Sequence, residues 1–211
     1  MTRAVPHATL ERLREVIARE GEALAPALAA PGAEGVFGPL ALACAGDRPE
    51  APELALVLES ILEGYLLHYG RGRLIETPDA DLRLLAGDHM YAVGLSRLSH
   101  LGDLDSVRAL ADLITLCARA HADADRGGVG AGPAALWQLT ALAVGGGRWP
   151  EYERLLEAAR AGRAGTDELL SEGRRRAAQL NVELEAQAAL IAFESAVADR
   201  PTPSNSGNFS P

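Results

Sequence analysis

The sequence predicts an all-α fold, a bundle of about six to eight helices. Leucine and alanine are abundant, whereas β-branched residues, which favour sheets, are few. Apolar residues recur at helical spacing, and no segment alternates apolar and polar residues as a strand does. Since 48% of the 211 residues are hydrophobic but only 4% are aromatic, the core must consist mainly of Leu, Ala and Val. This length suits one domain.

Capping residues and breaks rich in glycine and proline set the expected boundaries. Thr9, Thr77 and Thr166 are expected as N-caps, and Gly70 as a helix-ending residue. The domain is expected to cover residues 1–199, followed by a disordered tail at 200–211, which is rich in Pro, Ser and Asn. The expected helices cover about residues 9–29, 40–45, 52–69, 78–100, 103–122, 149–162 and 166–198. One more short helix is expected around Trp137, and it ends at the glycines 145–147.

Charge and motifs exclude several function classes. A formal net charge of −9 argues against binding to nucleic acid or to anionic membranes. No apolar run approaches the roughly 20 residues of a transmembrane segment, and none has signal-peptide character at the N-terminus, so we expect a cytoplasmic protein. Two cysteines are too few for a disulfide framework or a cysteine zinc site, and Cys117 is expected in the core. Motifs for nucleophilic or zinc chemistry are absent, so we predict neither catalytic residues nor metal ligands.

Three carboxylates lie in apolar helical surroundings. Glu59 and Glu63 stand one turn apart on a helix whose neighbouring positions are leucines. They form either a solvated face or a buried pair that needs an arginine or a metal as partner. Asp88 lies on an apolar stripe, where it is expected to be hydrogen-bonded inside the bundle or to line a cavity. Gly87 and Gly94, on the flank of that stripe, would let another helix approach closely.

Two histidines extend apolar stripes of their own helices. His68 follows the stripe that includes Tyr65, and His121 ends another, close to Asp123. The segment around His121 is either a metal site or a polar helix C-terminus. An independent metalloenzyme using Glu59, Glu63, His68, Asp88 or His121 is a third functional hypothesis. It is weak, because Glu59 and His68 are about 180° apart on an ideal helix.

The central region resembles the trans-isoprenyl diphosphate synthases over about residues 54–123. Glu59 and His68 have the nine-residue separation of a glutamate and a histidine in the family's first motif helix, which places "LLHYG" (66–70) on its Leu-Ile-His-Asp-Asp stretch. The segment "LLAGDHMYAVGLSRL" (84–98) matches the family's Leu-Ala-Gly-Asp-Tyr-Leu helix. The resemblance therefore implies an isoprenoid-synthase-like bundle.

The chain departs from that family where the metal-binding aspartates belong. "YGRGR" (69–73) takes the place of the first Asp-rich motif, and the region around 137–156 lacks the second. The connection that follows is too short for the family's arm with its two diphosphate-binding arginines. Magnesium is therefore expected only in a catalytic partner. Arg71 and Arg73 either bind a diphosphate directly or are solvated turn residues.

This pattern resembles the small, non-catalytic subunit of heteromeric heptaprenyl diphosphate synthases, which serve menaquinone biosynthesis. It implies an accessory subunit that is inactive alone, shapes product length and supports a partner with the Asp motifs. The alternative is a stand-alone protein with an apolar ligand in an interior pocket. The candidate ligands are a prenyl diphosphate and another apolar molecule, and the subunit hypothesis predicts that none is retained without the partner. The candidate binding residues are Arg71, Arg73, Glu59, Glu63, His68 and Asp88.

Overall fold

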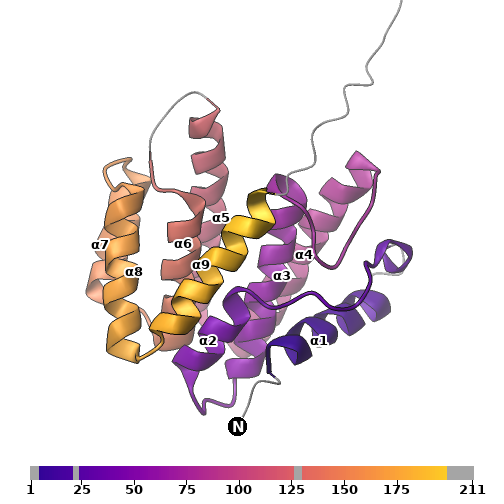
Figure 1. The fold of residues 1–211 in the computed structure, drawn as a ribbon, viewed down its shortest axis with the longest axis horizontal. Helices are drawn as coiled ribbons and strands as arrows, with labels where there is room; N and C mark the ends of the chain where they lie inside the picture. Colours follow the sequence, from indigo (N-terminus) through magenta and orange to yellow (C-terminus); the bar gives the residue numbers. More distant parts are fainter. Residues whose placement is uncertain (1–4, 21–23, 126–129, 199–211) are drawn as a thin grey trace, which may run out of the picture.

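The computed structural model describes residues 5–20, 24–125 and 130–198, and these residues confirm the all-α prediction. Figure 1 shows helices throughout, and the only β-type pairing within these ranges is an isolated antiparallel bridge between Leu28 and Ile75. The elements are α1 (Val5–Glu20), the 3₁₀ helix η1 (Ala25–Ala27), α2 (Phe37–Ala45), α3 (Ala51–Tyr69), α4 (Ala80–Leu101), α5 (Leu104–Ala124), α6 (Pro133–Gly146), α7 (Pro150–Arg160), α8 (Thr166–Leu180) and α9 (Glu183–Ala198).

Helix α3 is the central element of the fold. All its residues from Leu54 to Leu67 are buried, and it packs against α1, α2, α4, α6 and α9. In Figure 1 it lies in the middle of the molecule, with α1 and α4 to one side and α6 to the other. A helix buried on every side has no solvated face. The two glutamates on α3 must therefore find partners inside the protein.

Glycines bring α3 and α4 into close contact. A Cβ atom added at Gly94 would lie 2.7 Å from a side-chain carbon of Ile61, and one at Gly87 would lie 2.7 Å from the His68 imidazole. At Gly64, an added Cβ would lie 2.8 Å from the carbonyl oxygen of Gly87. These separations are shorter than van der Waals contact. The predicted role of Gly87 and Gly94 in close helix approach is confirmed.

Three expected boundaries of helices were wrong in the N-terminal half. Helix α1 begins at Val5, so Thr9 lies within it and is buried rather than capping it. The helix ends at Glu20, and Ala25–Ala27, with Pro26 in the middle, form a separate 3₁₀ helix. The N-cap of α4 is Asp79 rather than Thr77, since its carboxylate accepts hydrogen bonds from the first-turn amides.

The helix expected over 166–198 consists of two helices. Asn181 between them has φ of 57° in the left-handed region, which asparagine tolerates better than most residues, so the chain turns there. Gly165 rather than Thr166 is the N-cap of α8. The hydroxyl of Thr166 instead accepts a hydrogen bond of 2.8 Å from the backbone N–H of Gly132, at the start of α6.

Aromatic rings pack together at the centre of the main core. Phe37 and Trp137 are stacked with centroids 5.3 Å apart, and Tyr65 and Phe193 are stacked at 5.6 Å. Few aromatic residues are present, but they gather where α2, α3, α6 and α9 meet. Cys117 is buried in the same core, as predicted. The predicted tail at 200–211 lies outside the described residues.

Candidate functional site

Glu59 and Glu63 of α3 are both completely buried and lie beside the connection that follows the helix. Their spacing of four residues directs both carboxylates to the same side of α3. The solvated-face interpretation is therefore wrong for this pair. Because a buried carboxylate without partners is very unfavourable, the groups around the two side chains decide what the site is able to do.

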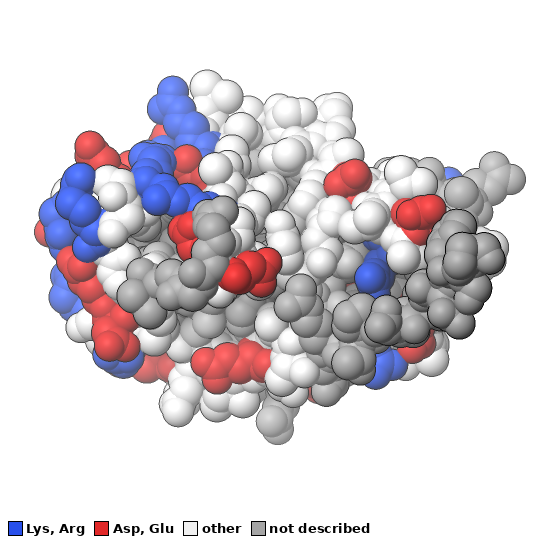
Figure 2. All heavy atoms as spheres, turned by 90° about the horizontal axis from the view of Figure 1, so that it is seen from above, with Lys and Arg blue, Asp and Glu red and all other residues white. Residues whose placement is uncertain are grey.

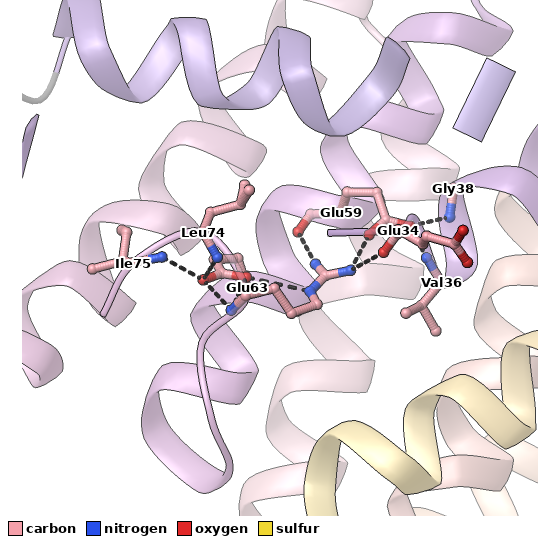
Figure 3. A network of polar contacts seen from close by, with 8 residues as sticks. Glu34, Val36, Gly38, Glu59, Glu63, Leu74 and Ile75 are labelled. Atoms are coloured by element: carbon pink, nitrogen blue, oxygen red, sulfur yellow. Dashed lines mark hydrogen bonds and ion pairs between the residues drawn. The ribbon is translucent and has the colours of Figure 1, made fainter. Parts of the chain in front are cut away.

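Arg73 supplies the charge that both glutamates share (Figure 3). Its Nη1 lies 2.6 Å from Oε2 of Glu59, and its Nε lies 3.3 Å from Oε2 of Glu63. Its remaining terminal nitrogen donates to the backbone carbonyl of Glu59 at 3.2 Å. The side chain is only 10% exposed. We call Glu59, Glu63 and Arg73 the buried ion network.

The second oxygen of Glu59 binds the start of α2. Its Oε1 accepts hydrogen bonds from the backbone N–H groups of Val36, at 2.7 Å, and Gly38, at 2.6 Å. These amides belong to the first turn of α2, where unpaired N–H groups carry partial positive charge. A Cβ atom on Gly38 would lie 2.9 Å from Cγ of Glu59. Glycine at this position lets the carboxylate reach the helix end.

Glu63 fixes the backbone of the connection between α3 and α4. Its Oε1 accepts from three consecutive N–H groups, those of Arg73 at 2.9 Å, Leu74 at 2.8 Å and Ile75 at 3.2 Å. Consecutive amides that converge in this way form an anion-binding turn. A Cβ atom on Gly72 would lie 2.9 Å from the same oxygen. The turn is therefore shaped around the glutamate.

Electrostatics and hydrogen bonding are both satisfied within the buried ion network. Burial lowers the pKa of Arg73, but attraction to Glu59 and Glu63 outweighs burial, so the pKa lies above its usual value and the guanidinium stays charged. Each of the four carboxylate oxygens accepts at least one hydrogen bond from the protein. Magnesium prefers carboxylate oxygens that are free to coordinate it, and these four already have protein donors.

Arg71 lies outside the network, on the surface. Its side chain is 57% exposed and forms an ion pair of 2.8 Å with Glu76. It borders a hollow of about 290 Å³, which is also lined by Ala29, Ala33, Gly72, Arg73, Glu76 and Ala196. Arg71 and Arg73, two residues apart in the turn, therefore have separate carboxylate partners.

His68 and Asp88 form a second, separate pair. Nε2 of His68 lies 3.2 Å from Oδ1 of Asp88, and the His68 ring stacks on Tyr91 with centroids 5.4 Å apart. The Asp88 side chain is 72% exposed, and Leu84, one turn before it, is 48% exposed. The prediction that Asp88 lies inside the bundle or lines a cavity was wrong, because its side chain lies on the exposed side of α4, although its neighbour Gly87 is buried.

His121 contacts two tyrosines of α3. Its Nε2 lies 2.8 Å from the Tyr65 hydroxyl, and its ring stacks on Tyr69 with centroids 4.1 Å apart and planes 7° apart. Among the residues that the structure describes, no group of three or more His, Cys, Asp or Glu side chains is arranged to hold a metal ion. The five residues of the metalloenzyme hypothesis thus lie in three separate places.

Sequence reasoning missed the backbone part of the site. The amides of Val36, Gly38, Leu74 and Ile75 have no side-chain signature, and they come from two different connections. One signal was available. Two glutamates stand four residues apart among leucines in a mainly apolar helix, and an arginine follows ten residues after the second, which is a pattern typical of a buried ion pair.

The surface at the α7 and α8 end carries charges of both signs. Figure 2 shows arginines interspersed there with Asp and Glu. Oppositely charged side chains form ion pairs there, for example Arg154–Glu168 at 3.4 Å and Arg175–Glu172 at 2.5 Å.

Within the described ranges, none of the helices combines the length and the apolar character needed to cross a membrane.

No family model, curated protein or solved structure matches this chain.

Proposed function

We propose that this chain is a non-catalytic subunit of a heteromeric long-chain prenyl diphosphate synthase. The observation that supports the proposal is the buried ion network. The sequence resemblance aligns the segment 69–73 with the family's first Asp-rich motif, and here that segment supplies Arg73 to two buried glutamates. The position serves to hold α2 and α3 together with the 70–76 connection.

The chemistry of the reaction explains why a partner is required. Ionisation of an allylic diphosphate needs magnesium held by clustered carboxylates, which stabilises the departing charge. In this chain, Glu59 and Glu63 are neutralised by Arg73 and by backbone amides. A partner with intact Asp motifs would hold magnesium and carry out elongation. This subunit would contribute apolar helical surface that limits how long the product grows.

Affinity purification of the tagged chain from its native cells tests the proposal. We expect an Asp-motif prenyl synthase to co-purify, and we expect the chain alone to show no elongation of farnesyl diphosphate with isopentenyl diphosphate and magnesium. The proposal fails if no such synthase co-purifies, or if the isolated chain elongates the substrate.

The alternative, a stand-alone binding protein for an apolar ligand, is favoured by one feature. A hollow of about 730 Å³ lies between the end of α5 and the starts of α6 and α8. Its wall combines Leu116, Ala120, Leu136 and Ala159 with the charged side chains of Arg119, Asp123 and Asp167. Native mass spectrometry of the purified chain separates the two functions. A retained lipid of defined mass supports the binding protein, whereas the subunit proposal predicts the mass of the bare chain.

A further inference from the structure

Helix α9 has a second apolar stripe that faces away from the bundle. Val182, just before the helix, and Ala186, Ala189 and Phe193 within it are buried against the bundle. On the opposite side, Leu184, Ala188 and Ile191 are exposed at intervals of four and three residues. Leu184 is 79% exposed and Ile191 is 62% exposed. We call these three exposed residues the outer stripe.

Carboxylates flank the outer stripe on both sides. Helical geometry at 100° per residue places Glu183 and Glu194 along one edge and Glu185 along the other. Helix α9 contains no lysine or arginine. Among the described residues, the side chains of these three glutamates take part in no ion pair or hydrogen bond. Within the described part of the chain, this surface is thus an apolar ridge with carboxylates along both edges.

We infer that the outer stripe of α9 is a docking surface for a basic amphipathic helix of a partner protein. A helix that is apolar on both faces is normally covered on both, and two large side chains here remain in solvent. An apolar ridge with two acidic edges complements a helix with an apolar stripe between basic residues. The inference does not depend on the partner's activity, so it stands apart from the proposed function.

The glutamates along the outer stripe also favour a basic helix over the other candidate binding partners. A second copy placed stripe to stripe would bring glutamates against glutamates, and an anionic lipid surface would meet the same repulsion. A basic helix instead gains attraction at both edges while covering Leu184 and Ile191.

Peptide binding to the full chain tests the inference. The probes are two fluorescein-labelled synthetic 18-residue helices with the same leucine stripe, one flanked by lysines and the other by glutamates. Fluorescence anisotropy at physiological salt is expected to show saturable binding of the lysine peptide and at least about tenfold weaker binding of the glutamate peptide. Equal affinity for the two peptides, or no binding of the lysine peptide, overturns the inference.

Variants separate docking on the stripe from general attraction to an acidic protein. The double variant Leu184→Asp/Ile191→Asp increases the negative charge but removes the apolar contact, and it should weaken lysine-peptide binding at least about tenfold. Leu104→Asp, at a similarly exposed leucine of α5, is the matched control and should leave binding unchanged. Glu185→Lys/Glu194→Lys should reverse the preference between the peptides.

All the substituted side chains are exposed, so we expect each variant to fold. Circular dichroism checks this. Undiminished binding by Leu184→Asp/Ile191→Asp would contradict docking on the stripe. A different outcome is that the wild type self-associates and does not bind the lysine peptide, and that the double variant abolishes the self-association. A second copy would then cover the stripe, and this result would also overturn the inference.

Discussion

At the scale of single residues, Arg73 determines whether two buried glutamates are tolerated. A carboxylate loses several kcal/mol of solvation when it is buried, and a close cation with additional hydrogen bonds offsets this loss. Arg73 is the ion-pair partner of both Glu59 and Glu63. Removal of this one side chain would leave two adjacent negative charges inside the protein.

Arg73→Met should therefore be strongly destabilising. We expect a loss of about 3–5 kcal/mol in the free energy of unfolding, measured by urea denaturation, or the absence of a cooperative transition. Arg71→Met is the matched control, because Arg71 is exposed and its ion pair with Glu76 is worth at most about 1 kcal/mol. Equal stability of the two variants would show that the network does not hold the fold together.

The sequence predicts only part of this site. The interval between Glu59 and Glu63 correctly predicts a shared helix face, and their burial was one of two open interpretations. The sequence does not reveal that the chain after Gly70 turns back so that three backbone amides donate hydrogen bonds to Glu63. That turn depends on the close packing around Gly72, which is a tertiary feature without periodicity in the sequence.

At the scale of elements, Glu53 at the start of α3 connects two neighbouring helices. Its carboxylate pairs with Arg12 of α1 and Arg97 of α4, each at 2.7 Å. Burial raises the pKa of Glu53, but the hydrogen bonds and charges of Arg97 and Arg12 outweigh burial. The pKa therefore lies below its ordinary value of 4.5.

A depressed pKa in the folded protein makes this connection dependent on pH. The stabilisation is complete above the ordinary pKa of 4.5, which applies to the unfolded chain, and is lost as the pH falls through the lower folded-state pKa. Glu53→Gln should thus cost about 1 kcal/mol at pH 7 and progressively less below about pH 4. Urea unfolding at a series of pH values measures this, with the exposed Glu157→Gln as control. A cost that is independent of pH would argue against the ion pairs.

Gly64→Ala tests the close packing of α3 on α4. Alanine in an open helical position stabilises by up to about 1 kcal/mol relative to glycine. Here the added methyl group would lie 2.8 Å from the carbonyl oxygen of Gly87 and 2.8 Å from the Tyr91 ring, so we expect a loss of about 1–3 kcal/mol. The change in the thermal unfolding midpoint measures this, and we expect a lower midpoint. A higher midpoint would contradict the prediction and mean that α3 and α4 move apart without loss of stability.

The existence of helices is easier to predict from this sequence than their ends. Glycine- and proline-rich breaks correctly separate α3 from α4 and α6 from α7. The division between α8 and α9 was missed because Asn181 carries no proline or glycine signal, and the apolar residues continue on both sides. Boundaries that depend on one left-handed residue are not encoded in hydrophobic periodicity.

At the scale of the whole molecule, the described residues gather their fully buried carboxylates in one place and leave apolar side chains exposed elsewhere. The buried ion network joins α2, α3 and the 70–76 connection, and the rings of Phe37, Tyr65, Trp137 and Phe193 fill the centre of the core. Large apolar side chains at Leu85, Leu104, Leu184 and Ile191 are more than half exposed. Under the proposed function, a partner subunit would cover part of this apolar surface.

Product length gives the most direct test of this account. A catalytic Asp-motif synthase that co-purifies with the chain would be assayed with farnesyl diphosphate, labelled isopentenyl diphosphate and magnesium, alone and in a one-to-one complex with this chain. We predict longer products or higher elongation activity in the complex, and no elongation by this chain by itself. An identical product distribution and activity with and without the chain would contradict the proposed role.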